Sequence, residues 1–115
     1  MITLQLCLGD DVNKESYYVD DGCKTEHDNN KDDVVGSFQP KSFLAGVRCC
    51  TMNGSTCVTL GSCPDDATTY EYAVSECRKM GHRLCTKDEL LSDVCCRTGG
   101  DCDNFPVWTS TLDDT

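Results

Sequence analysis

The chain has 115 residues, the length of one domain, and eleven cysteines, roughly a tenth of its composition. Its formal net charge of -10 at pH 7 repels nucleic acids and anionic lipids, which argues against both as direct partners. A cysteine content at this level is typical of a disulfide scaffold in an oxidising compartment. We therefore expect an extracellular, cell-surface or luminal protein.

Zinc binding is the alternative role for the cysteines. A structural zinc site is typically built from Cys-x2-Cys pairs that recur at regular separations. The chain has no such pair, its cysteine spacings are irregular, and His27 and His82 are its only histidines. We therefore favour disulfides, with one cysteine unpaired or bonded to another chain, among Cys7, Cys23, Cys49, Cys50, Cys57, Cys63, Cys77, Cys85, Cys95, Cys96 and Cys102.

The N-terminal part, residues 1–41, is predicted to be acidic and rich in loops. Its opening MITLQLCL alternates well enough for one strand, but it lacks the basic start of a signal peptide and the length of a membrane span. Residues 9–33 are polar and are predicted as long loops. An exported form would be a mature product, an excised domain or a fragment, with no insertion into a membrane. Residues 42–115 are predicted to form a cysteine-rich core within the same folded unit.

A β-hairpin is predicted over residues 43–60, because FLAGVRCCTM and STCVTL flank Asn53-Gly54. A two-residue turn there places Cys50 opposite Cys57, which makes them a candidate disulfide pair, although Cys50 retains other partners. Cys49 then points to the other face of the strand. Asn53 also begins an N-glycosylation sequon, Asn-Gly-Ser, on an exposed turn.

Two helices are predicted next, over residues 69–80 and 87–94. Thr68 with Glu71, and Thr86 with Glu89, have the spacing of capping boxes. Gly81 is a helix stop after the first helix. Cys77 lies on the apolar stripe of that helix and is predicted to be a buried disulfide partner.

The chain ends in a predicted strand over residues 106–111. Trp108 in this strand is expected in the core rather than as a platform for a ligand. Before it, Asp101, Asp103 and Asn104 offer clustered oxygen atoms of the kind that calcium prefers. An ordinary Asx-rich turn beside Cys102 is the favoured alternative.

Two stretches together resemble the C-type lectin-like superfamily, closest to the branch of formylglycine-generating-enzyme-like and bacterial surface domains. They are TTYEYAVSECRKMGHRLCTKDELL and VWTST, within about residues 66–112. Cys85 stands where that branch has a proline. The matching positions are Gly81, Arg83, Leu84, Thr86, Glu89, Leu90, Trp108, Thr109, Ser110 and Thr111.

The resemblance implies an α+β fold, a small disulfide-rich domain with two helices packed on a short antiparallel sheet. It also implies that Arg83 is a hydrogen-bonded structural link between helix and sheet. The calcium-holding Glu-Pro-Asn or Gln-Pro-Asp and Trp-Asn-Asp motifs of the sugar-binding members are absent after the helices, and so is the copper-binding cysteine pair of the oxidase branch. No catalytic residue carries over.

We expect no enzyme activity, because no cysteine or hydroxyl nucleophile stands in a recognisable motif with a base. The favoured function is a recognition module that binds glycan or protein through loops, with calcium as an optional cofactor. The alternatives are a structural subunit of an extracellular or luminal assembly, for which the odd cysteine count is the argument, and a small secreted inhibitor.

Overall fold

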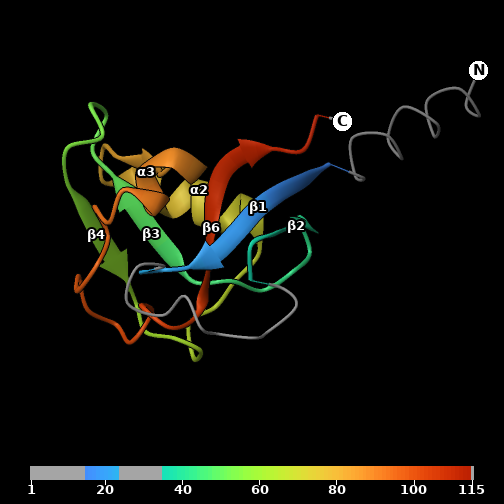
Figure 1. Ribbon diagram of the computed structural model, residues 1–115, viewed down its shortest axis with the longest axis horizontal. Coiled ribbons are helices and arrows are strands. Elements are labelled where there is room, and N and C mark those ends of the chain that lie inside the picture. The colour runs from blue at the N-terminus through green and yellow to red at the C-terminus, as the bar shows by residue number, and fades with distance from the viewer. Residues whose placement is uncertain (1–14, 24–34, 115) are drawn as a thin grey trace, which may run out of the picture.

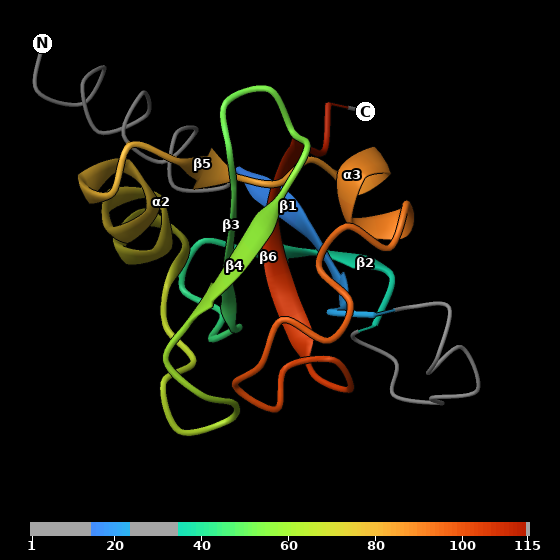
Figure 2. The same cartoon turned by 90° about the vertical axis from the view of Figure 1, so that its left-hand side faces the viewer.

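The computed structural model describes residues 15–23 and 35–114. These residues form an α+β fold with two three-stranded antiparallel sheets, of order β2-β1-β6 and β4-β3-β5. Figure 1 shows the arrangement of the elements, and Figure 2 shows α2 at one side of the strands and α3 at the other. In chain order they are β1 (Ser16–Asp21), β2 (Ser37–Pro40), β3 (Val47–Cys50), β4 (Cys57–Leu60), α2 (Tyr70–Lys79), β5 (Arg83–Leu84), α3 (Lys87–Leu91) and β6 (Pro106–Leu112).

The two sheets meet where β6 passes the start of β3. Gly46 forms a parallel bridge with Val107, and its backbone N–H donates to the carbonyl of Pro106 at 2.9 Å. A Cβ atom on Gly46 would lie 2.6 Å from the sulfur of Cys63, so the close approach requires glycine. The expectation of two helices on one sheet is therefore wrong, because the described strands make two sheets joined at this point.

Strand β1 corrects the prediction that residues 9–33 are loops. It is the central strand of its sheet, and Val19, Asp20 and Asp21 have no exposed surface. The Asp20 carboxylate accepts a 2.6 Å hydrogen bond from the Tyr18 hydroxyl and another from the Asp21 amide. Burial, with Asp20 beside it, raises the pKa of Tyr18. The predicted strand over MITLQLCL lies outside the described residues.

The hydrophobic core has two parts. In the first, Trp108 of β6 is fully buried and its indole N–H donates to the carbonyl of Thr68 at 2.8 Å, which confirms the prediction for this residue. Tyr70 packs edge-to-face on Trp108 and stacks on Tyr17. The second part surrounds Leu90 and is rich in sulfur, with Cys50, Cys57, Cys63, Cys85, Cys95, Cys102 and Val107.

The helices begin close to their predicted starts, but only one capping box forms. At α3, the Thr86 side chain accepts from the Glu89 amide and the Glu89 carboxylate accepts from the Thr86 amide. At α2 the N-cap is Thr69, without a side-chain bond, because the backbone of Thr68 is paired with Ala45 instead.

The helix ends are only partly as predicted. Gly81 follows α2 with φ +76°, as expected of a helix stop. Helix α3 ends at Leu91, three residues before the predicted end, and the turn that follows has Asp93 at φ 73°.

The β3–β4 hairpin has the predicted register, with Cys49 opposite Val58 and Cys50 opposite Cys57. Its turn differs from the predicted two-residue type, since only Gly54 has a positive φ, at +76°, and its amide donates to the Thr51 carbonyl. The turn is therefore centred on Met52 and Asn53, with Gly54 in the left-handed conformation after it.

Candidate functional site

Five disulfides join ten of the eleven cysteines, while Cys7 lies outside the described residues. They link elements that are far apart in the chain, over separations of 28 to 73 residues, and they indicate a small domain of an oxidising environment. The pairs are Cys23–Cys96, Cys49–Cys77, Cys50–Cys85, Cys57–Cys95 and Cys63–Cys102.

The candidate pair Cys50–Cys57 is wrong, although the two residues are opposite each other as predicted. Strand β3 lies between β4 and β5, so Cys50 has a neighbour on either side, and it bonds to Cys85 beyond β5. Cys57 bonds to Cys95 in the segment after α3. The four sulfur atoms lie within 4.8 Å of one another, but as two bridges they offer no thiolate to a metal.

In each of the two double cysteines, the neighbouring residues form disulfides with different parts of the chain. For the first, this follows from the alternation of side chains along β3. Cys49 is bonded to Cys77 on α2, whereas Cys50 is bonded to Cys85. The second double cysteine divides in the same way, since Cys95 is bonded to β4 and Cys96 to Cys23 after β1. Each double cysteine thus connects one point of the chain to two others.

The segment between α3 and β6, residues 92–105, contains no helix or strand, and we call it the C-terminal loop. Three of the five disulfides end in it, at Cys95, Cys96 and Cys102. Arg97 and Asp101 adopt positive φ values of 60° and 58°. Such backbone conformations are uncommon in non-glycine residues, and the chain neighbours of these two residues, Cys96 and Cys102, are both in disulfide bridges.

Arg48 of β3 holds the same loop from beneath. Its side chain has no exposed surface, and its guanidinium forms a 2.7 Å ion pair with Asp103 and donates to the carbonyl of Gly99 at 3.1 Å. It also donates to the carbonyl of Gly22 and to the hydroxyl of Thr59, both at 2.9 Å. Burial lowers the pKa of Arg48, and Asp103 opposes that effect.

The sequence analysis missed Arg48. The only local signal was a charged residue placed between Val47 and the double cysteine, in a strand whose neighbours are all apolar. A cation in such a strand is buried only with partners. Three of those partners follow Arg48 by 11 to 55 residues, and Gly22 precedes it by 26 residues, so the sequence did not identify them.

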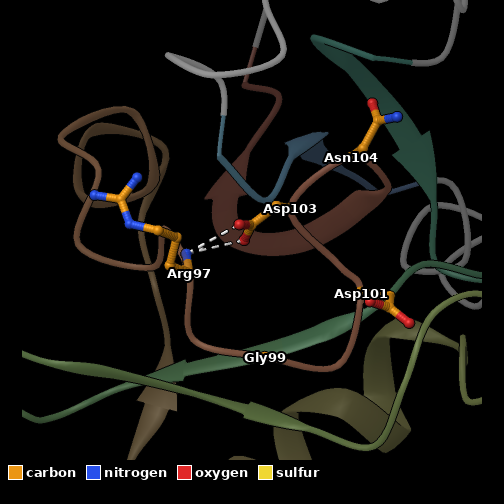
Figure 3. A pocket seen from close by; sticks show the side chains of 5 residues that line it. All are labelled: Arg97, Gly99, Asp101, Asp103 and Asn104. Atoms are coloured by element: carbon orange, nitrogen blue, oxygen red, sulfur yellow. Dashed lines mark hydrogen bonds between the residues drawn. The ribbon is translucent and has the colours of Figure 1, made fainter.

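A hollow of about 440 Å³ lies over the C-terminal loop, and Figure 3 shows the side chains around it. The Asp103 carboxylate accepts hydrogen bonds from the backbone N–H of Arg97 at 3.0 and 3.2 Å. Asp101 points away from Asp103 in Figure 3, on the other limb of the loop. The lining residues are Arg97, Gly99, Asp101, Asp103 and Asn104.

The predicted calcium ligands therefore lie around one hollow, but they do not converge. Asp103 pairs with the Arg48 guanidinium and accepts hydrogen bonds from the Arg97 amide, so its carboxylate is already bonded to two groups of the protein. Among the parts of the chain that the structure describes, two groups of three or more cysteine, histidine or carboxylate side chains lie close enough to share an ion. Neither includes Asp101 or Asp103. A calcium site at these residues has no support from this geometry.

The other residues singled out in the sequence, Arg83, Glu89 and Asn53, lie outside the C-terminal loop. Arg83 donates to both carboxylate oxygens of Glu89 at 2.8 Å and to the carbonyl of Met52, so it links β5, α3 and the hairpin turn as expected. This ion pair lowers the pKa of Glu89 to about 2. Asn53 is exposed at the hairpin turn, where a glycan could be attached.

Comparisons of the chain with family models, with curated proteins and with solved structures return no match. In the described part of the chain, no helix is long and apolar enough to cross a membrane. His27 lies outside that part, and His82 has no cysteine thiol beside it, because the ten cysteines described are all in bridges.

Proposed function

We propose that the protein is a non-catalytic recognition module of an extracellular or luminal space, which binds a glycan or a protein through its C-terminal loop. The observation that carries the proposal is the fastening of this loop. Three disulfides and the ion pair of the buried Arg48 with Asp103 hold a segment that has no helix or strand. Binding residues are commonly carried by loops that a rigid scaffold positions.

The chemistry of the hollow favours a polar ligand. Arg97, Asp101 and Asn104 are exposed, and together they offer a cation, an anion and an amide around one space. A loop already held in one conformation loses little entropy on binding, so more of the contact energy appears as affinity. Hydroxyl-rich sugars and polar protein surfaces both suit such a set of donors and acceptors. The resemblance to C-type lectin-like domains points the same way and remains a proposal.

Glycan-array and protein-library screens with the wild-type chain test this function. Arg97→Ala and Asn104→Ala should each weaken a specific interaction by about tenfold, the loss expected of one central polar contact. Lys79→Ala, an exposed cation on α2 away from the hollow, is the control and should bind like the wild type. A ligand that binds all three variants equally would place recognition elsewhere on the molecule.

A structural subunit of a covalent assembly is the second candidate. The odd cysteine count favours it, since the five bridges use ten cysteines and leave Cys7. Light scattering under non-reducing conditions distinguishes the two candidates. A disulfide-linked oligomer that becomes monomeric with Cys7→Ser would support the assembly role, and a monomeric wild type would remove this argument for it.

A further inference from the structure

A second, smaller hollow of about 240 Å³ lies between α2 and β5, which are side by side in Figure 2. Part of its wall is apolar, from Tyr70 and Val74 of α2 and Leu84 of β5. The rest includes Arg78, His82 and Ser110, which bring positive charge, a ring nitrogen and a hydroxyl group. Basic residues thus gather at one hollow of a chain whose net charge is -10.

Two of these polar groups lack partners within the described part of the chain. No carboxylate lies within ion-pair distance of the Arg78 guanidinium, whereas Lys79, the next residue, pairs with Glu76 at 2.9 Å. The Nδ1 atom of His82 is buried and has no hydrogen-bond partner. Buried polar atoms are nearly always paired, so the unpaired nitrogen of a residue that lines the hollow indicates a missing hydrogen-bond partner.

The other cation of the hollow is already neutralised. Both terminal nitrogens of Arg83 are bonded to Glu89, so Arg83 contributes no net charge that a ligand could use. Arg78 is therefore the group that decides the charge preference. The adjacent C-terminal end of α2 disfavours an anion by about two- to fivefold. A charge-assisted hydrogen bond to a guanidinium favours one by about ten- to a hundredfold, so attraction prevails.

We propose that this hollow is a binding site for a small organic carboxylate. Arg78 and His82 would hold the anionic group, and Tyr70, Val74 and Leu84 would contact an apolar body. The volume is below that of typical pockets for drug-sized molecules, which limits the ligand to about the size of one ring with one carboxylate. The site shares no residue with the C-terminal loop, so the proposal stands apart from the function proposed above.

Benzoate titrated into the isotopically labelled protein, followed by nuclear magnetic resonance, tests the site. We expect saturation with one benzoate per chain and shifts centred on the signals of His82, Arg83 and Ser110. Benzamide keeps the ring without the charge, and acetate keeps the charge without the ring, so both should bind at least tenfold more weakly. Glucuronate, a carboxylate on a polar body, should also bind more weakly than benzoate.

Paired variants identify the deciding cation. Arg78→Gln should weaken benzoate binding by about tenfold or more, while Lys79→Gln removes the same charge one residue away and should change it less than twofold. Both positions are exposed, so both variants should fold, and circular dichroism is the measurement that checks this.

Three results would overturn the proposal: equal losses in the two variants, benzamide binding as tightly as benzoate, or no saturation at tens of millimolar benzoate. Tighter binding of glucuronate would refute the apolar contact.

Discussion

Replacement of Arg48 by methionine tests whether the buried guanidinium holds the C-terminal loop in place. Methionine keeps an unbranched apolar stem of similar reach, so the substitution removes the charge and the donors without a large cavity. It leaves Asp103 without its ion pair and the carbonyls of Gly22 and Gly99 without a donor. The variant therefore isolates the polar contribution of one side chain.

The expected loss of stability is about 3 kcal/mol. Removal of one partner of a buried ion pair costs about 3–5 kcal/mol, because the other charge stays in place without compensation. The lower end applies here, since the Asp103 side chain is 22% exposed and water can solvate it in part. For a domain of this size, that loss lowers the melting temperature by about 10–15 °C.

Urea unfolding with the disulfides intact measures the effect, and Trp108, the only tryptophan and a fully buried one, supplies the fluorescence signal. Arg78→Met makes the same change at an exposed arginine and should stay within about 0.5 kcal/mol of the wild type. Asp103→Asn combined with Arg48→Met should cost less than the sum of the single variants. Additive losses, or a loss below about 1 kcal/mol for Arg48→Met, would show that the pair does not hold the loop.

Further expectations concern the bridges, the Glu89 pair and calcium. Mass mapping of the unreduced protein should find Cys50 with Cys85 and no Cys50–Cys57 peptide, and replacement of Cys49 and Cys77 by alanine should cost about 3–4 kcal/mol in urea unfolding, as the chain-entropy model gives for a loop of 28 residues. Because the folded pKa of Glu89, about 2, lies below its ordinary 4.5, its pair with Arg83 stabilises the fold above pH 4.5. That stabilisation, about 1–2 kcal/mol for a partly exposed pair, is lost as the pH falls toward 2 and should be absent in Glu89→Gln. Millimolar calcium should leave the melting temperature unchanged, and a rise of several degrees would restore the calcium hypothesis.

Elements with strong local signals were predictable from the sequence. The capping box at Thr86, the left-handed glycine at Gly81 and the alternation across the β3–β4 hairpin each involve residues within one turn or one hairpin. Such signals depend on backbone geometry that the neighbouring residues largely determine. For this reason α2, α3, the hairpin register and β6 were close to their predicted places.

Elements that depend on distant partners were not predictable in this way. Asp20 and Asp21 resemble a solvated acidic pair, but both are buried in β1, the central strand between β2 and β6, and β6 lies some ninety residues along the chain. The Thr68 capping box failed for a similar reason, since Ala45 competes for its backbone groups. Tertiary pairing of this kind overrides local propensity.

The position of the candidate loop site could be predicted from the sequence, whereas the contacts of its carboxylates could not. Asp101, Asp103 and Asn104 do lie around one hollow, as their spacing suggested. The sequence could not show that Arg48 forms an ion pair with the Asp103 carboxylate, because the two residues are 55 positions apart. Strand alternation likewise predicted the direction of Cys50 and not its partner, since β5 brings a second cysteine within reach from the other side.

The placement of the bridges bears on what the C-terminal loop is for. A disulfide stabilises mainly by restricting the unfolded chain, and that effect depends on loop length rather than on where the bridge lies in the fold. Stability alone would therefore not require three of five bridges to end within residues 92–105. The bridges that end there do restrict the folded conformation of that loop. Beneath the loop lies Arg48, whose burial carries a desolvation cost. Such restriction of a surface loop is explained if another molecule recognises the shape of that loop. A variant whose loop residues are rearranged in sequence should therefore lose binding, and unchanged affinity would contradict this reasoning.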